Sequence, residues 1–302
     1  MTMGENGTGR LLGIGDEGAK ALEDQIRLHR ELGWRALELR TIDGTALHDI
    51  PDDRHEEHAR RLRESGITVA VLDTPIGSWA YDVGRPLDED ARMLDRYAAI
   101  GRTYGTTRMR VMSYPNDGRP EGDWRRAALR RMSHLAARAS DLGITLLHEN
   151  CHGWASTDPH KSLEMLAEVG SPHLTLLFDT GNGVSYGYDS LEFLAPIVQH
   201  VQHVHVKDST TVDGEVVFVE PGTGDSRVLE CVELLEESGY RGLYSIEPHL
   251  HLVPHQKKRG DASRMPAEYL AYGQLTENLL AKVVRPAAAS NTVEGEVGHG
   301  PS

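Results

Sequence analysis

The sequence has little of several features that would define its class at once. It contains only two cysteines, Cys151 and Cys231, which are too few for a disulfide framework and too far apart for a good zinc site. No stretch approaches the roughly 18 apolar residues that a membrane span needs. The first residues, MTMGENGTGR, lack the apolar core of a secretory signal. We therefore expect a reduced, cytoplasmic protein without a membrane partner.

Basic residues are scarce relative to acidic ones. Lys and Arg number 32 against 46 Asp and Glu, which gives a formal net charge of −14. Nucleic-acid binding depends on clustered positive charge, whereas the basic stretches RHEEHARRLR and DWRRAALRRM are interleaved with acidic or apolar residues. Such stretches are typical of solvated helix faces. The composition therefore argues against nucleic acid as a partner.

Short apolar runs alternate with amphipathic stretches along the chain, a pattern typical of βα units around a parallel sheet. The expected strands end near Gly15, Arg40, Asp73, Ser113, Glu149, Asp179, Lys207 and Glu247. The expected helices cover 19–33, 52–65, 88–104, 123–143, 159–169, 190–199, 226–238 and 266–285. Eight strands alternating with eight helices predict a single (β/α)8 TIM barrel over residues 10–285, with an open doubly wound sheet as the alternative.

Outside this alternation the chain carries tail and turn signals. Residues 1–9 are Gly-rich and polar, and residues 286–302 have no apolar periodicity, so we expect both to be disordered tails. Asp123 is expected to cap the helix that it begins. The segment PGTGD at 221–225 predicts a turn before the last helix, because glycine and proline together favour turns.

The late strands end in side chains that hard metal ions prefer as ligands. In TIM barrels the working residues lie at the C-terminal ends of strands. Alternation in VQHVHVKD places His203, His205 and Lys207 on one face. Charges that point into a barrel are costly to bury unless something pairs with them, and a metal ion would do so. The predicted ligands of one divalent ion are Glu149, Asp179, His205 and Glu247.

Three carboxylates and one imidazole favour Mn²⁺ or Mg²⁺, with Co²⁺ or Zn²⁺ as alternatives. Each residue taken singly also has a structural explanation. A lone carboxylate at a strand end often caps the next helix, and we expect His203 to be a hydrogen-bonded interior residue rather than a ligand. Trp79 and Trp154, in expected loops, are candidates either for the wall of a sugar pocket or for ordinary loop packing. Four such groups at consecutive strand ends favour a site.

The motifs around these residues resemble the xylose isomerase-like barrel family, which includes sugar epimerases, inosose dehydratases and apurinic-site endonucleases. The resembling motifs are LLHEN at 146–150, LLFDTGN at 176–182, HVHVKD at 203–208, PGTGD at 221–225 and YSIEPH at 244–249. The first half of the chain matches in pattern only, with LELR at 37–40. The order and spacing of these motifs carry the resemblance more than any one of them.

The resemblance implies roles for the four predicted ligands. The family binds its metal through the corresponding Glu, Asp, His and final Glu. Family isomerases and epimerases use two metal-bound glutamates on opposite faces of the substrate, which makes Glu149 and Glu247 the implied catalytic pair. One removes a proton beside a carbonyl, and the other returns a proton to the enediolate. Lys207 and Asp208 resemble groups that orient His205 or hold a substrate oxygen.

The chain also departs from the family pattern. The family often has a histidine three residues after the Asp, and this chain has Asn182 there, which weakens any second metal site. VLDTP and RVMSY lack the histidines that a three-metal endonuclease requires, which speaks against DNA repair. The candidate substrate contacts are Lys207, Asn182, His203 and Trp154.

These observations predict a metal-dependent isomerase or epimerase that acts on a small sugar or polyol. The same proton removal can begin an elimination, so a dehydratase or lyase acting on a keto-sugar, an inosose or an oxidised C-glycoside is the alternative. A non-catalytic metal-bound barrel, or a subunit of a larger complex, is the alternative from another class. The sequence leaves open the substrate and whether the chain forms a homo-oligomer.

Overall fold

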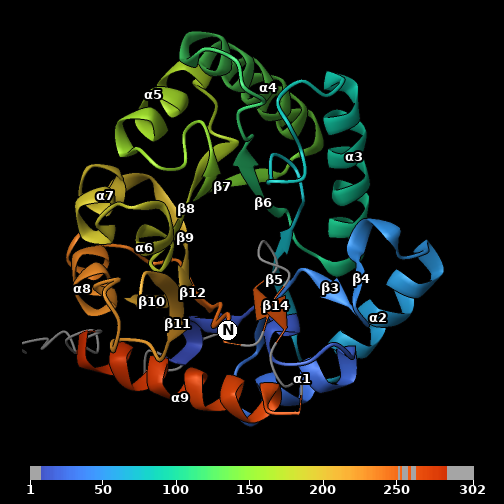
Figure 1. Cartoon of the computed structure of the whole chain (residues 1–302). Coiled ribbons are helices and arrows are strands. Elements are labelled where there is room, and N and C mark those ends of the chain that lie inside the picture. Colours follow the sequence, from blue (N-terminus) through green and yellow to red (C-terminus); the bar gives the residue numbers. More distant parts are fainter. Residues whose placement is uncertain (1–7, 251, 254–257, 260–262, 284–302) are drawn as a thin grey trace, which may run out of the picture.

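The computed structural model describes residues 8–250, 252–253, 258–259 and 263–283. At its centre lies an eight-stranded parallel sheet in the order β1-β12-β9-β8-β7-β6-β5-β2. A parallel bridge between Ile14 and Glu38 brings the two ends of this sheet together. Figure 1 looks down the resulting barrel, with the strands in the middle and the helices in an outer ring. The predicted (β/α)8 barrel is confirmed.

The barrel strands lie where the alternating pattern predicts them. They are β1 Leu11–Gly13, β2 Ala36–Leu39, β5 Thr68–Asp73, β6 Arg108–Ser113, β7 Thr145–Gly153, β8 Leu174–Asp179, β9 Val201–Val206 and β12 Leu243–Ile246. Three of them, β5, β6 and β8, end at the expected residue. In contrast, β7 continues past Glu149 to Gly153.

The helices of the outer ring overlap the eight predicted segments. They are α1 Leu22–Glu31, α2 Asp52–Glu64, α3 Leu87–Tyr104, α4 Glu121–Leu142, α5 Pro159–Val169, α7 Ser190–Ile197, α8 Val228–Glu237 and α9 Met265–Val283. The expected cap at Asp123 is wrong, because α4 begins at Glu121 after Pro120. Asp123 lies instead in the first turn, where a negative charge suits the helix dipole.

Several short elements were not predicted, and three strand pairs and one helix among them stand around the C-terminal mouth of the barrel. The hairpin β3 Thr41–Ile42 and β4 Thr45–Ala46 follows β2, and the helix α6 Asn182–Tyr186 follows β8. The hairpin β10 Asp208–Val212 and β11 Glu215–Val219 follows β9, and the pair β13 Leu252–Val253 and β14 Lys258–Arg259 follows β12. Figure 1 shows these elements at the end of the barrel that faces the viewer. Short 3-10 helices lie at Thr8–Arg10, Gly15–Glu17, Leu47–Asp49 and Val198–His200.

The barrel interior changes from apolar to charged along the strands. Val71, Leu147 and Leu177 form a small buried apolar cluster. Because side chains two apart in a strand share a face, the next inward positions toward the mouth are Asp73, Glu149 and Asp179, and all three are buried as well. The main apolar core is a separate cluster built from strand and helix residues. The period of the strands therefore places these three carboxylates one step above apolar side chains, although Glu38 and His203 are in register with Val71 and Leu177.

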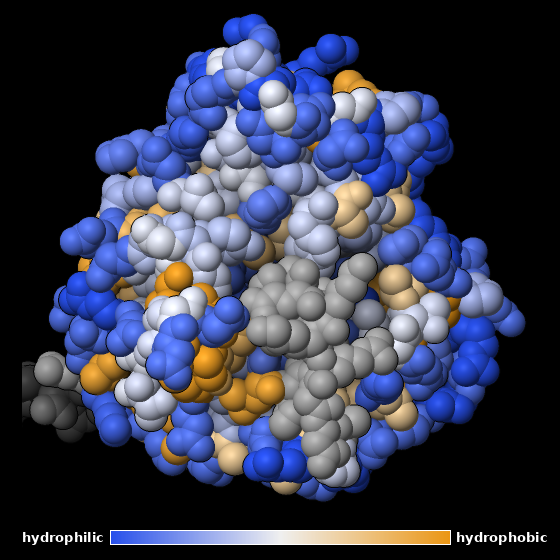
Figure 2. Space-filling model, in the orientation of Figure 1, coloured by the Kyte–Doolittle hydropathy of each residue, from blue (hydrophilic) through white to orange (hydrophobic). Residues whose placement is uncertain are grey.

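The outer surface is mostly hydrophilic in the view of Figure 2. The large hydrophobic side chains with the greatest exposure among the described residues are Trp79, Val212 and Val217, the last two on the β10–β11 hairpin. No helix in the described part of the chain has the length and apolar content to span a membrane. Of the tails expected to be disordered, residues 1–7 and 286–302 lie outside the described residues.

Candidate metal and active site

Four buried side chains meet at the C-terminal mouth of the barrel. Glu149, Asp179, His205 and Glu247 each offer a ligand atom, and these atoms all lie within 4.8 Å of one another. The first three project from β7, β8 and β9, and Glu247 directly follows β12. His205 Nδ1 lies 3.5 Å from Glu247 Oε2, 3.9 Å from Glu149 Oε1 and 4.0 Å from Asp179 Oδ2. The structure thus brings together the four residues that the sequence marks as ligands.

The two glutamates divide their oxygens between the centre of this cluster and an arginine. Glu149 turns Oε1 toward His205, while its Oε2 accepts a hydrogen bond from Arg110 Nη1 at 2.9 Å. Glu247 turns Oε2 toward His205, while its Oε1 accepts from Arg40 Nη1 at 2.9 Å. Burial by itself would raise the pKa of Glu247, but Lys207, His249 and His205 hold that pKa well below its usual range.

Asp179 divides its oxygens in the same way, with backbone amides in place of an arginine. Its Oδ1 accepts from the N–H groups of Gly181 at 2.7 Å and Asn182 at 3.1 Å, at the start of the short helix α6. Asn150 fixes the strand end, because its side chain bonds both the N–H and the carbonyl oxygen of Asp179. Burial raises the pKa of Asp179 to about 7, although Lys207 opposes this shift. Asp179 Oδ2 is thereby directed to the centre.

A carboxylate beneath the cluster orients His205. Glu38, on β2, lies 3.1 Å from His205 Nε2 through Oε1 and 2.9 Å from His203 Nε2 through Oε2. Among the described residues, His205 Nδ1 has no hydrogen-bond partner, although it is fully buried. Burial alone would lower the pKa of His205, but Glu38 and Glu247 raise it well above its usual value. A carboxylate on the far nitrogen of an imidazole is the usual support of a metal-binding histidine.

Lys207 brings a positive charge to the same oxygens. Its Nζ lies 2.6 Å from Asp179 Oδ2 and 2.9 Å from Glu247 Oε2. Lys207 follows β9 directly and shares the inward face of His203 and His205, as the alternation predicts. Burial would lower the pKa of its ammonium group, but the surrounding carboxylates raise it well above its usual value.

The charge balance of the mouth favours a further cation. Its carboxyl groups are Asp16, Glu17, Glu38, Asp73, Glu149, Asp179 and Glu247, and all seven are buried. The cationic side chains beside them, in the described part of the chain, are Arg40, Arg110 and Lys207. With the histidines counted as neutral and every carboxyl group as ionised, seven carboxyl groups against three cations leave a formal excess of four negative charges, which is costly in a buried site. The raised pKa values of Asp179, Glu17 and His205 reduce this excess when those groups are protonated. With a buried imidazole nitrogen that lacks a partner, this donor set fits a divalent ion.

The four candidate substrate contacts have different surroundings. Lys207 faces the cluster, and Asn182 donates from Nδ2 to Glu149 Oε1 at 3.2 Å. His203 is the hydrogen-bonded interior residue that the alternation predicts, because it lies against Glu38.

The structure gives no support to Trp154 as a wall of the pocket. Its indole N–H donates to Glu121 of α4, and its ring faces Arg125 of α4 and Lys161 of α5. The side chain is buried, with 2% of it exposed. The packing alternative therefore explains Trp154, since its contacts lie with the outer helices.

Asp208 has a different role from the one that the resemblance implies. Its carboxylate accepts four backbone N–H bonds, from Ser209, Gly222, Gly224 and Ser226, at 2.8 to 3.2 Å. The predicted turn at 221–225 is therefore built around this carboxylate. A Cβ at Gly224 would lie 2.4 Å from Asp208 Oδ1, so the close approach requires glycine there. Asp208 shapes the loop, and the orientation of His205 comes from Glu38.

Sequence reasoning missed the functional side chains of the first half of the barrel. Glu38, Arg40 and Arg110 all contact residues of the cluster, and none of them was a candidate. The alternation in LELR already places Glu38 and Arg40 on one face. The sequence therefore indicated that Glu38 and Arg40 share a face. Without the fold, it could not show which residues on other strands they contact.

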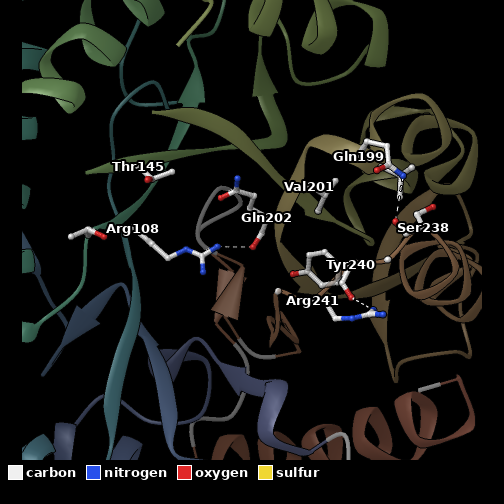
Figure 3. Close-up of a pocket in the computed structure, with 12 residues that line it drawn as sticks. Arg108, Thr145, Gln199, Val201, Gln202, Ser238, Tyr240 and Arg241 are labelled. Atoms are coloured by element: carbon white, nitrogen blue, oxygen red, sulfur yellow. Dashed lines mark hydrogen bonds between the residues drawn. The ribbon is translucent and has the colours of Figure 1, made fainter. Parts of the chain in front are cut away.

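An open pocket of about 510 Å³ lies at the opposite, N-terminal end of the barrel. Figure 3 shows its polar lining, in which Arg108 donates to the carbonyl oxygen of Gln202 and Arg241 to that of Tyr240. Thr145 and Val201, the first residues of β7 and β9, also line it. This pocket holds none of the groups that meet at the mouth.

Comparisons with known proteins cover most of the chain. The model of the xylose isomerase-like TIM barrel family matches residues 26–269. An inosose dehydratase from Clostridium perfringens is 28% identical over 143 residues, which cover 42% of this chain and 48% of that protein. An uncharacterized protein from Methanocaldococcus jannaschii is 31% identical over 121 residues, 38% of this chain and 41% of that protein. The chain spans less than half the length of these curated relatives.

Solved structures share the fold over nearly the whole chain. The IOLI protein with a bound zinc atom has a TM-score of 0.74 at 15% identity, covering 91% of this chain and 99% of that one. A barrel protein from Mycobacterium smegmatis in complex with magnesium has a TM-score of 0.64 at 18% identity, covering 89% and 97%. The 3-keto-D-glucoside 4-epimerase YcjR from E. coli has a TM-score of 0.64 at 16% identity, covering 89% and 98%. At these identities the likeness shows the fold.

Proposed function

Because the chain belongs to the xylose isomerase-like TIM barrel family, we propose that it is a divalent-metal-dependent enzyme. It isomerises or epimerises a small sugar or polyol-derived ketone by moving a proton at the carbon next to the carbonyl. The observation that supports this proposal most strongly is the buried cluster at the mouth. In it, three carboxylates and one imidazole direct one atom each to a common centre.

The metal ligands in this proposal are Glu149 Oε1, Asp179 Oδ2, His205 Nδ1 and Glu247 Oε2. A bound divalent ion supplies Lewis-acid stabilisation of the negative charge that develops on a carbonyl oxygen when the neighbouring carbon loses a proton. Oxygen-rich ligation favours Mn²⁺ or Mg²⁺, and the neighbours with zinc and magnesium support a divalent ion without selecting one.

The two glutamates are the proposed proton-transfer groups. In each, the oxygen turned away from His205 accepts one arginine N–H bond. A carboxylate oxygen has two lone pairs, so Glu149 Oε2 and Glu247 Oε1 each retain a site for a proton. One glutamate starts ionised and takes the proton from the carbon, whereas the other starts protonated and gives its proton to the enediolate. Exchange with solvent then restores the protonation state of both. Both glutamates are buried from solvent, which strengthens their electrostatic interactions with the substrate.

Lys207 and Asn182 are the proposed substrate contacts. Lys207 faces the metal-directed oxygens of Asp179 and Glu247, and Asn182 lies beside Glu149. Both can donate hydrogen bonds to hydroxyl or carbonyl oxygens of a sugar or polyol. His203 acts at a distance from the substrate in this proposal, since it holds Glu38 under His205.

A dehydratase is the second candidate, and one observation favours it. The inosose dehydratase relative matches 42% of this chain at 28% identity. Elimination of water begins with the same proton removal beside a carbonyl, so the same glutamates can serve it. The two candidates differ in the fate of the group on the next carbon, which leaves in an elimination and stays in an epimerisation.

Solvent-deuterium exchange into candidate keto-sugars and inososes tests the proposal. The purified protein, loaded with Mn²⁺ and held in D₂O, should incorporate deuterium beside the carbonyl, and mass spectrometry reads both exchange and loss of water. Glu149→Gln and Glu247→Gln should each lose exchange by at least about 100-fold, since positioned acid–base groups contribute on that scale. Exchange without loss of water supports the epimerase, and loss of water supports the dehydratase.

Metal content provides the independent readout. Elemental analysis should find about one divalent ion per chain, which is lost in His205→Ala. A protein that holds no ion after reconstitution with Mn²⁺, Mg²⁺, Co²⁺ or Zn²⁺ contradicts the proposal, and the non-catalytic barrel then becomes the better explanation.

A further inference from the structure

Two arginines at the mouth hold the metal-site glutamates from outside the cluster. Arg110 bonds the Glu149 oxygen that faces away from His205, and Arg40 does the same for Glu247. Each arginine is itself anchored by acids of the first half of the barrel. Asp73 lies 3.3 Å from Arg110 Nε, while Asp16 and Glu17 contact Arg40 Nη2.

We propose that Arg40 and Arg110 are positioning residues that limit the site to one ion and limit each glutamate to one metal-facing oxygen. This inference rests on the proposed metal site and adds to it the reason why coordination positions stay open for a substrate. Neither arginine is proposed to touch the substrate, because the side-chain hydrogen bonds of both go to the carboxylates around them and, for Arg110, also to the carbonyl oxygen of Thr74.

The argument for Arg110 concerns the geometry of Glu149. A carboxylate can bind a divalent ion through one oxygen or through both. Glu149 Oε2 is engaged by Arg110 at 2.9 Å, and both side chains are buried. Binding through both oxygens would require this ion pair to open inside the protein, and breaking a buried pair is strongly unfavourable. The pair therefore leaves Glu149 Oε1 as the metal ligand and one coordination position free.

The argument for Arg40 concerns a second group of potential ligands. Glu17, Glu247 and His249 also offer atoms within 4.8 Å of one another, and Glu247 belongs to both groups. Arg40 already bonds Glu247 Oε1 and Glu17 Oε1, so its guanidinium supplies the positive charge of this second group. A second ion would need the same oxygens and would be repelled by the arginine. Arg40 thus stands where a second cation would otherwise be favoured.

Arg110→Met and Arg40→Met test the two parts of the proposal. In Arg110→Met, Glu149 gains freedom to bind through both oxygens, and a buried positive charge near the ion is removed. Mn²⁺ affinity measured by titration calorimetry should then rise about tenfold or more, while the visible absorption of bound Co²⁺ weakens as the coordination number increases. In Arg40→Met, elemental analysis and titration should detect a second ion per chain. Turnover should fall in both variants.

The controls separate positioning from a general loss of structure. Arg131→Met removes an equally buried arginine, paired with Asp90 between α3 and α4, with 6% of its side chain exposed against 8% for Arg110. This variant should lose stability but keep one ion and the wild-type Co²⁺ spectrum. Arg40→Lys keeps the charge and should keep one ion per chain. If a methionine variant does not fold, Arg40→Gln and Arg110→Gln remove the charge with a polar side chain and carry the same expectations.

The outcomes distinguish this inference from the proposed function. Weaker Mn²⁺ binding with an unchanged Co²⁺ spectrum in Arg110→Met, or a single ion in Arg40→Met, overturns the positioning role while the metal enzyme stands. A wild-type protein that binds no ion overturns the proposed function itself.

Discussion

The two ends of this barrel are built from the same eight strands, and they use charge in opposite ways. At the C-terminal mouth, seven buried carboxyl groups face three cationic side chains around a common centre. At the N-terminal end, charges pair locally, as Arg10 does with Glu236 and with the backbone of Tyr240 and Gly242.

An open pocket and the convergent charged side chains lie at different ends of the barrel. The open pocket of about 510 Å³ lies at the N-terminal end, where its polar groups bond neighbouring backbone (Figure 3). The significance of the mouth lies in its excess of buried carboxyl groups over cationic side chains. Burying charge is costly, so a convergent and unbalanced set of carboxylates indicates a site more strongly than an open volume does.

Among the variants that test this difference between the two ends, Glu38→Gln should have the largest effect on metal binding at the mouth. An amide cannot accept hydrogen bonds from both His203 and His205, and it removes the charge that supports the His205 ring. Mn²⁺ affinity measured by calorimetry should fall about 10- to 100-fold, as for other residues that orient a metal ligand. Gln202→Ala, on the same strand as His205 but at its exposed start, should keep wild-type affinity. Unchanged affinity in Glu38→Gln would show that His205 needs no carboxylate to face the centre.

Asp208→Asn should separate loop structure from metal binding at the same mouth. An amide cannot accept all four N–H bonds that the carboxylate receives, and its own NH₂ opposes some of them. The free energy of unfolding should fall by about 2 to 3 kcal/mol in urea denaturation. Metal affinity should change far less than in Glu38→Gln. Asp225→Asn, which has one exposed bond to Thr210 in the same loop, is the matched control and should be nearly neutral.

Arg108→Ala tests the N-terminal end and should have the smallest effect. The Arg108 side chain donates a hydrogen bond to the carbonyl oxygen of Gln202 at 2.6 Å. Its removal should lower the free energy of unfolding by about 0.5 to 1.5 kcal/mol, with metal content and turnover unchanged. Loss of turnover in a folded, metal-loaded Arg108→Ala would break the comparison, because it would place a functional group at the end that we assign to structure.

The local pattern was enough for the barrel and for part of its mouth. Period-two alternation predicted that His203, His205 and Lys207 share the inward face, and the helix stop at Gly143 ends α4 as expected. Asp123 shows the limit of such signals, because Pro120 begins the helix earlier than the candidate cap. Trp154 shows another limit, because a residue in a mouth loop can turn to the outer helices. Nothing in the local sequence decides between those two directions.

Other features depended on partners far away in the chain. Glu38 lies opposite His203 and His205, Arg40 opposite Glu247, and Arg110 opposite Glu149. The contacts of Glu38 and Arg40 join segments that only the closed sheet brings together, whereas Arg110 and Glu149 lie on the neighbouring strands β6 and β7. No spacing rule within one strand could assign any of these contacts. The hairpin β10–β11 and helix α6 follow the predicted strands β9 and β8, but neither element was itself predicted from its own segment.

By itself, the sequence determined that strands and helices alternate eight times, and which faces of the strands carry carboxylates, histidines and a lysine. It did so because those features follow from periods of 2 and 3.6 residues. Only the tertiary structure decided which oxygen of each glutamate faces His205, and which arginine holds the other oxygen. That choice depends on barrel closure and on the balance of buried charges from all around the mouth. Such a balance belongs to the assembled site and to no single segment of the chain.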